Sequence, residues 1–189
     1  MGGRVAPTCR MPSRSSAVPG RAQVMRIFVT GPTGAGKTTL ARRLGCRHGI
    51  ACHALDDLHW VRRPEGDVRR PLEEKLPLLQ HIVDGECWIV EGVQFKWADP
   101  ALARADHIVV IDAPSWRTTL QIVLRLGRQW LGLEAAAYRP TLARLPQMLA
   151  WSRDYHREER ALLLAKLAPF RARTLLIRHS RARLPPPLD

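Results

Sequence analysis

The sequence predicts an α/β protein whose parallel sheet is covered by helices on both faces. A glycine-rich loop at residues 31–38 joins an apolar run to a stretch of helical periodicity. From Met25 onward, short apolar runs typical of buried strands alternate with longer stretches whose apolar residues recur at helical spacing. Acidic residues follow several of these runs, at the edge where open parallel sheets bind their ligands.

The first two strands flank the loop and the helix that follows it. We expect strand 1 over residues 26–30, a helix from residue 37 to about residue 46, and strand 2 over residues 50–55. Gly49 ends that helix. The charged segment 61–70 contains Pro64 and Gly66, so we expect it to be a mobile loop.

The remaining chain continues the alternation. A helix over residues 72–83 begins after Pro71, a residue suited to the start of a helix. Further strands are expected over residues 87–90, 107–111 and 174–177, and further helices over residues 115 to about 131 and 141 to about 167. The stretch with Phe95 and Trp97 is assigned to no element.

The composition fits one domain. A chain of 189 residues can bury a core without disulfides, and we expect residues 25–184 to form it, with a disordered extension at residues 1–24 and a flexible tail at residues 185–189. The four cysteines lack metal-binding spacing, so we expect free thiols that mostly fill the core. No apolar run is long enough to cross a membrane, and we expect a cytoplasmic protein, monomeric or homodimeric.

The net charge of +13 raises the question of a polyanionic partner. No recognisable nucleic-acid-binding motif accompanies the charge, and enzymes that handle phosphates are also locally basic. Nucleic acid is therefore the less favoured partner, and no membrane partner is expected.

The loop itself carries the most specific motif. Its sequence, Gly31-Pro32-Thr33-Gly34-Ala35-Gly36-Lys37-Thr38, fits the phosphate-binding pattern G-x-x-x-x-G-K-[ST] at every fixed position. The glycines allow successive backbone N–H groups to converge on phosphate oxygens at a helix N-terminus. Lys37 would reach the β- and γ-phosphates of a nucleotide, Thr38 would bind Mg²⁺ through its hydroxyl, and Thr39 would contact a more proximal phosphate.

Acidic residues follow three of the expected strands at the same edge as this loop; they are Asp56, Asp57, Glu91 and Asp112. Asp112 ends an apolar run in the manner typical of an aspartate that holds Mg²⁺ directly or through water. Asp56 or Asp57 could orient or deprotonate an acceptor hydroxyl or help to hold the metal, although Asp57 is also suited to cap a short helical turn. Glu91 is the third candidate, and a structural salt bridge to an arginine is its alternative.

Two groups of basic residues are candidates for phosphate or base contacts. Arg117, Arg125 and Arg128 share one side of the helix at residues 115–131, whose broad apolar side is expected to face the core. Arginine stabilises the charge of phosphoryl transfer, but a basic stripe is also typical of a solvated face. Arg178 and His179 follow the last strand, where they could stack on a nucleotide base or belong to a charged tail.

Together these stretches resemble the P-loop nucleoside-monophosphate-kinase superfamily, and within it the adenylate-kinase-like proteins described as DNA topology modulation proteins. The matching stretches are GPTGAGKTTLARRLG from residue 31, LDDLHW from residue 55, WIVEG from residue 88, IDAP from residue 111 and IRHS from residue 177. The resemblance implies a three-layer α/β/α P-loop NTPase fold with a five-stranded parallel sheet in the order 2-3-1-4-5. It also implies an acceptor site beside Asp56 and Asp57, and a small helical lid around residues 115–140 that carries the three arginines.

The resemblance breaks near the acceptor site, where relatives often have Gly-Asn-Tyr and this chain has Gly92-Val93-Gln94. The leading hypothesis is a kinase that uses ATP and Mg²⁺ to phosphorylate a small acceptor, either a nucleoside, a nucleotide or a small hydroxylated metabolite. One alternative is a nucleotide-dependent regulatory or nucleic-acid-associated ATPase. Another is an NTPase whose only acceptor is water.

Overall fold

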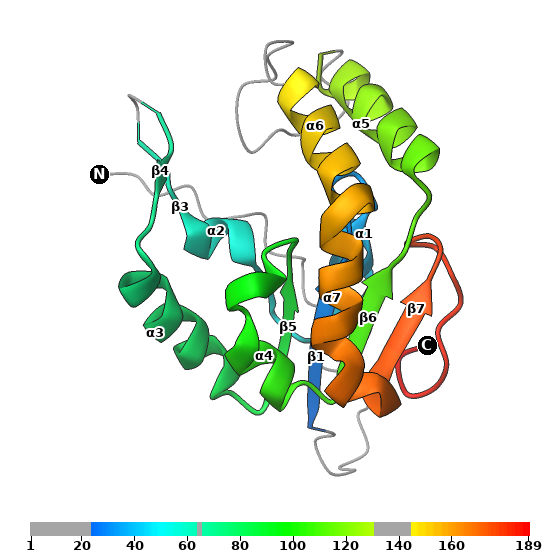
Figure 1. Ribbon diagram of the computed structural model, residues 1–189. Coiled ribbons are helices and arrows are strands. Elements are labelled where there is room, and N and C mark those ends of the chain that lie inside the picture. Colours follow the sequence, from blue (N-terminus) through cyan, green and yellow to red (C-terminus); the bar gives the residue numbers. More distant parts are fainter. Residues whose placement is uncertain (1–23, 64–65, 131–144) are drawn as a thin grey trace.

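The computed structural model describes residues 24–63, 66–130 and 145–189. Five parallel strands form one sheet in the order β2-β5-β1-β6-β7 (Figure 1). The strands are β1 (Met25–Thr30), β2 (Cys52–Ala54), β5 (Cys87–Glu91), β6 (His107–Ile111) and β7 (Thr174–Ile177). Counted within this sheet alone, the order is 2-3-1-4-5, so the predicted fold class and strand order are confirmed.

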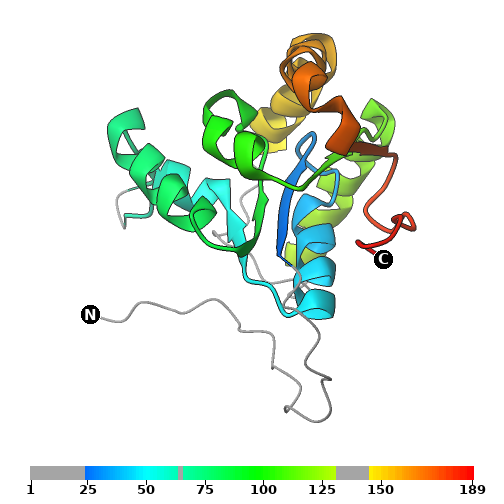
Figure 2. The same cartoon turned by 90° about the horizontal axis from the view of Figure 1, so that it is seen from below.

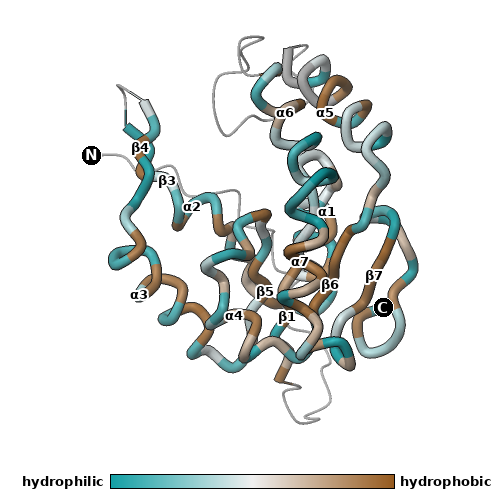
Figure 3. The backbone as a smooth tube through the Cα atoms, viewed as in Figure 1, coloured by the Kyte–Doolittle hydropathy of each residue, from teal (hydrophilic) through white to brown (hydrophobic). Residues whose placement is uncertain are grey.

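Helices cover both faces of the sheet because the side chains of each strand alternate between them. In β1, Ile27 and Val29 pack with α1 (Lys37–His48), whereas Phe28 belongs to the buried cluster on the other face. That second cluster includes residues of α3 (Leu72–Val83), α4 (Asp99–Arg104) and α7 (Arg160–Leu167). Figure 2 shows α1 on the opposite side of the sheet from α4 and α7, and Figure 3 shows hydrophobic residues along the central strands.

Short elements fill the connections between the strands. After β2 come α2 (Leu55–His59) and a two-stranded antiparallel hairpin of β3 (Trp60–Val61) and β4 (Val68–Arg69). A 3-10 turn, η1 (Phe95–Trp97), follows β5. After β6 come α5 (Ser115–Trp130), α6 (Leu145–Asp154), a π-helical turn (Tyr155–Glu159), α7 and a second 3-10 segment (Ala168–Arg173). Within the described residues, no helix is long and apolar enough to cross a membrane.

Strand 2 and the segment after it differ from the prediction. β2 has only three residues, and Leu55 begins a helix instead of ending the strand. The acidic pair Asp56 and Asp57 falls in the first turn of α2, where negative charge is favoured by the helix dipole. The hairpin β3–β4 overlaps the segment 61–70, which was expected to be a loop. Strands of two residues are too short to show a hydrophobic period in the sequence. The short elements η1 and α4 were not predicted for the same reason.

The cysteines and the C-terminal segment also differ from the prediction. Cys46, Cys52 and Cys87 form no disulfide within the described residues, but all three are exposed instead of filling the core. Cys9 lies outside the described residues. Leu184 and Leu188 are 3% and 2% exposed and pack in the cluster with α1. Leu188 lies in the segment expected to be a flexible tail, and it packs against the domain together with Leu184, the last residue of the expected domain.

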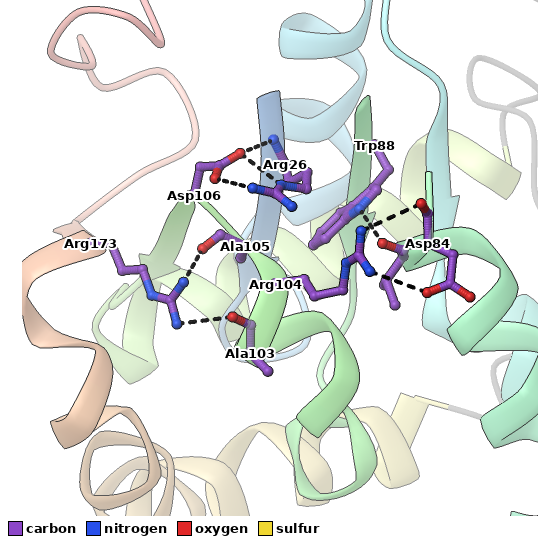
Figure 4. Close-up of polar contacts among 9 residues, drawn as sticks. Arg26, Asp84, Trp88, Ala103, Arg104, Ala105, Asp106 and Arg173 are labelled. Atoms are coloured by element: carbon purple, nitrogen blue, oxygen red, sulfur yellow. Dashed lines mark hydrogen bonds and ion pairs between the residues drawn. The ribbon is translucent and has the colours of Figure 1, made fainter. Parts of the chain in front are cut away.

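Polar contacts join the chain at the amino ends of the strands, the end of the sheet opposite the glycine-rich loop (Figure 4). The guanidinium of Arg26 in β1 donates two hydrogen bonds to Asp106, which precedes β6, at 3.1 and 2.8 Å, and the backbone N–H of Arg26 donates a third at 2.9 Å. Arg173 donates to the backbone oxygen of Ala105 at 2.7 Å. These contacts fix neighbouring strands to one another at that end, which leaves the carboxyl edge available for ligands.

We predict that Leu188→Ala lowers the free energy of unfolding by about 2–4 kcal/mol, because it leaves a cavity in a packed core. The matched control is Leu162→Ala in α7, where the side chain is 55% exposed and truncation should change the free energy by less than about 0.5 kcal/mol. Urea unfolding of both variants measures the difference. Equal effects of the two substitutions would show that the C-terminal segment does not contribute to the core.

Candidate active site

The loop between β1 and α1 has the backbone shape that its glycines require. Gly31, Gly34 and Gly36 have φ values of 145°, 81° and 88°, in the region that favours glycine. A Cβ atom at Gly31 would lie 2.5 Å from the backbone oxygen of Ile111. Gly36 caps α1 without a side-chain hydrogen bond, and the first turn of α1 has no acidic residue. The N–H groups at this helix N-terminus are thus suited to an anion.

Lys37 lies over the loop that it follows. Its side chain is buried, with the residue 9% exposed, and its Nζ donates to the backbone oxygen of Pro32 at 2.9 Å. Its positive charge also acts on Glu91, where it lowers the pKa of the carboxyl. Lys37 therefore stands between the phosphate loop and the end of β5.

Glu91 is a carboxylate that contacts the phosphate loop directly. The Thr38 hydroxyl donates to Glu91 Oε1 at 2.7 Å, and Glu91 is 7% exposed. Burial raises the pKa of Glu91, while Lys37 and the Thr38 hydrogen bond oppose that shift. Among the described residues Glu91 has no ion pair with an arginine, so the structural salt bridge offered as its alternative is not found.

Asp56 and Asp57 lie close enough to Glu91 for their charges to raise its pKa further. Both are exposed in the first turn of α2, and Ala54 is the N-cap residue, so the interpretation of Asp57 as a cap is wrong. The side-chain amide of Gln94 donates to Asp56. No hydrogen bond to the Asp57 carboxylate is found in the described part of the chain.

Gly92 allows α2 to approach the end of β5. A Cβ atom there would lie 2.7 Å from Leu55 Cβ, and Leu55 is fully buried. The glycine after Glu91 therefore has a packing reason, and it brings the acidic turn of α2 beside the end of the strand.

Asp112 lies at the end of β6 as predicted, but its carboxylate is held by Arg160 of α7. Arg160 Nε donates to Oδ1 at 2.8 Å and Nη2 donates to Oδ2 at 2.7 Å. This bidentate pair lowers the pKa of Asp112. No hydrogen bond joins Asp112 to Thr38 within the described residues. Arg160 was not predicted from the sequence, because no local pattern relates it to a residue 48 positions away.

Helix α5 packs directly against the phosphate loop. A Cβ atom at Gly34 would lie 2.8 Å from Ile122 Cγ1 and 2.9 Å from the backbone oxygen of Thr118. Thr118 and Ile122 are the buried residues among those of α5 whose side chains are described. The side chains of Trp130 and Leu131, which were expected to face the core, lie outside the described residues. The other residues of the expected core side are exposed instead; they are Trp116, Leu120, Val123, Leu124 and Gly127. The prediction for the apolar side was wrong because α5 lies beyond the sheet edge, where only a narrow side meets the loop.

The three predicted lid arginines are only partly described. Arg117 is half-buried and Arg128 is exposed, and the side chain of Arg125 lies outside the described residues, as does much of the predicted lid. A polar cluster joins α5 to α6: Thr118 Oγ1 lies 2.8 Å from Ser152 Oγ and 3.5 Å from His156 Nε2. This cluster links the helix on the phosphate loop to the segment that carries Arg160.

The chain after β7 also reaches the loop. A Cβ atom at Gly36 would lie 2.7 Å from Ser180 Oγ, so this segment lies against the phosphate loop. Arg178 is exposed, and His179 is partly buried with no hydrogen-bond partner for Nδ1 among the described residues. The position next to the loop fits the predicted contact with a nucleotide base, which stays a prediction.

No protein-family model matches the chain, and no curated protein sequence matches it. Among solved structures it is similar to a gluconokinase from Sinorhizobium meliloti 1021, at 16% identity and a TM-score of 0.47 over 84% of this chain and 85% of that one. It is also similar to a shikimate kinase from Bacteroides thetaiotaomicron, at 17% identity and a TM-score of 0.49 over 82% and 86% of the two chains. Because both TM-scores are below 0.5, we draw no conclusion from this likeness, and we base the function on the residues of the site.

We predict that Glu91→Gln stabilises the protein in the absence of ligands. A buried carboxyl whose pKa is raised destabilises the fold when it ionises, so this cost is absent below its ordinary value of 4.5 and complete above its raised value. The variant should gain melting temperature over the wild type as the pH rises from about 4 to 8. The exposed Glu86→Gln is the matched control. A Glu91→Gln variant that is less stable at every pH would contradict this assignment.

Proposed function

We propose that the chain is a kinase that transfers the γ-phosphoryl group of ATP to a hydroxyl group of a small acceptor. The observation that carries this proposal is the hydrogen bond from Thr38 to Glu91 at the N-terminus of α1, with Lys37 beside it. It combines a phosphate-binding loop, a hydroxyl and a carboxylate in one place, as phosphoryl transfer requires. The resemblance to DNA topology modulation proteins adds only this kinase-like site, and we do not extend it to an action on DNA.

The donor half of the site fits ATP with Mg²⁺. The loop N–H groups and Lys37 would hold the β- and γ-phosphates. The oxygens of Thr38 and Glu91 are the hard ligands that Mg²⁺ prefers, and the ion would neutralise the charge that develops on the phosphates. Within the described residues no cluster of three acidic, histidine or cysteine side chains could hold a metal. We therefore expect Mg²⁺ to take most of its ligands from water and from the phosphates, as it usually does in such sites.

The acceptor half lies at the first turn of α2. The acceptor oxygen would attack the γ-phosphorus, forming a new P–O bond while the bond to the leaving ADP oxygen breaks. The hydroxyl proton would pass to Asp57, which is exposed and has no hydrogen bond among the described residues. Asp56 accepts from Gln94, so we assign it a positioning role.

Arginines of the helical segment would complete the site. Arg117 and Arg128 lie on α5, which packs on the phosphate loop, and Arg160 lies on α7. We propose that Arg160 exchanges its carboxylate partner, Asp112, for a phosphate oxygen when nucleotide binds, because a guanidinium fork matches both groups. Asp112 would then become available as the second carboxylate near the metal, the role that the sequence favoured.

We predict that Lys37→Ala lowers ATP turnover by about a hundredfold or more, because it removes a charge aimed at the transferred group. The control Lys166→Ala removes a lysine that pairs with Asp99 on the far side of the fold from the loop, and it should retain wild-type turnover. ADP release by purified protein measures both. Unchanged turnover in Lys37→Ala would place the active site elsewhere.

We predict that Asp57→Asn lowers kcat for the acceptor by about a hundredfold, with little change in the KM for ATP, because a general base is lost. Asp56→Asn should act mainly through the KM for the acceptor, because Asp56 positions and does not take the proton. Steady-state kinetics with saturating ATP separate the two effects. A larger loss of kcat in Asp56→Asn than in Asp57→Asn would reverse the two assignments.

A further inference from the structure

A cavity of about 380 Å³ opens between the start of α3 and η1, next to α2. Basic side chains line it; they are Arg69, Arg70, Lys75 and Lys96. Trp97 forms another part of the wall, and no acidic residue is among the described residues that line the cavity. Its volume lies in the range of small-molecule sites. The proposed kinase function does not yet use this cavity.

Lys75 is the most informative residue of the wall. It is only 2% exposed, and no carboxylate contacts it among the described residues. Its nearest partners are His59 Nδ1, 3.3 Å from Nζ, and the Trp97 ring, whose centroid lies 4.9 Å from Nζ. Burial and the charge of Arg69 lower the pKa of Lys75. A buried ammonium without a carboxylate destabilises the fold, and an apolar residue would fill the space better.

The other basic residues divide into two kinds. Arg70 pairs with Glu74 at 3.5 Å, and Lys96 pairs with Glu159 at 2.8 Å. Arg69 has no ion pair in the described part of the chain, and it is exposed at the cavity. Positive charge at Arg69 and Lys75 is therefore not balanced by the protein.

The tryptophan in the wall of the cavity also has a polar group without a hydrogen-bond partner. Trp97 Nε1 is a buried donor with no hydrogen-bond partner in the regions described. The Trp97 ring stacks on His59, with centroids 6.2 Å apart and planes 20° apart. An unpaired donor beside an unbalanced lysine indicates a wall that is completed by a ligand.

The position of the cavity relates it to the acceptor site. His59 is the last residue of α2, and Asp57 lies in the first turn of the same five-residue helix. At about 100° per residue, however, these two positions lie on nearly opposite sides of the helix, so the cavity is related to the acceptor site through η1. Gln94, the N-cap residue of η1, donates to Asp56, and Trp97 at the other end of η1 lines the cavity. The cavity therefore adjoins the turn of α2 that carries Asp56 and Asp57.

We propose that the acceptor carries an anionic group, a phosphate or a carboxylate, which Lys75 and Arg69 bind beside Trp97 while the reacting hydroxyl lies at Asp57. The identification of the bound molecule as a phosphoryl acceptor rests on the proposed kinase function. The presence of an anion site in the cavity does not. The proposal narrows the acceptors from any hydroxylated molecule to those that carry a negative charge. Neutral alcohols and nucleosides are thereby excluded as good substrates.

The first test uses acceptors in matched sets: glycerol, glycerate and glycerol phosphate, and a nucleoside with its 5′-monophosphate. ADP release is measured with ATP and Mg²⁺. We expect the anionic members alone to raise it, and the member that works identifies the group as phosphate or carboxylate. Lys75→Met should raise the KM for that acceptor about tenfold or more without changing the KM for ATP, since a charged hydrogen bond is lost. Equal stimulation by neutral and anionic members would overturn the proposal.

The second test does not depend on catalysis. Inorganic phosphate and acetate are titrated into protein whose loop is filled with ADP and Mg²⁺, and binding is followed by calorimetry. We expect wild type and Lys75→Arg to bind at least one of the anions, and Lys75→Met to bind about tenfold more weakly or not at all. Arg69→Gln, at an exposed position, gives the same readout if Lys75→Met does not fold, and Arg42→Gln on α1 is the control for general charge loss.

The outcomes separate the two proposals. Binding of an anion that depends on Lys75, without stimulation by any acceptor, supports the anion site and counts against the kinase. Binding that is equal in wild type, Lys75→Met and Arg69→Gln, or absent from all three, overturns the anion site whatever the kinase activity.

Discussion

The hydrogen bond from Thr38 to Glu91 depends on a strand order that distance along the chain does not suggest. The two residues are 53 positions apart, yet they meet because β5 pairs with β1 and the two strands end at the same edge. Burial raises the pKa of the Glu91 carboxyl, and Lys37 and the Thr38 hydroxyl of the phosphate loop oppose that shift. A carboxylate held in this way is suited to a cation and a phosphate, and the glycines of the loop and Gly92 leave room for them.

The proposed donor and acceptor halves of the site, at the same edge of the sheet, differ in how their buried charges are balanced. At the loop, a buried carboxylate is balanced by Lys37, and Asp112 is balanced by Arg160. At the start of α3, by contrast, Lys75 is buried without a carboxylate. The five residues of α2 connect these regions, because one end of the helix faces Glu91 and the other contacts Lys75. An anionic acceptor, as proposed above, would balance the charge of this second half.

Much of the framework could be predicted from the sequence, because strands in the interior of a parallel sheet are continuous apolar runs with clear ends. The bounds of β6 and β7 agree with prediction to the residue, and the phosphate loop has the expected position between strand and helix. The strand order came from the resemblance and not from the pattern. Elements of two to six residues, such as β3 and α4, are too short to show a recognisable hydrophobic period in the sequence.

The site was harder to predict where it depends on contacts between distant elements. Periodicity shows that α5 has an apolar side, but it does not show that the helix leaves the sheet and turns Thr118 toward the loop. The pairs Arg160–Asp112 and Lys75–His59 join elements far apart in sequence and have no local signature. The most direct test of the account is the affinity of a non-hydrolysable ATP analogue with and without Mg²⁺, measured by calorimetry on wild type and Glu91→Ala. We expect Mg²⁺ to strengthen wild-type binding by about tenfold and to have little effect on the variant, since the carboxylate beside Thr38 is lost. An equal effect of Mg²⁺ on both proteins would contradict the assignment of Glu91 to the metal and phosphate site.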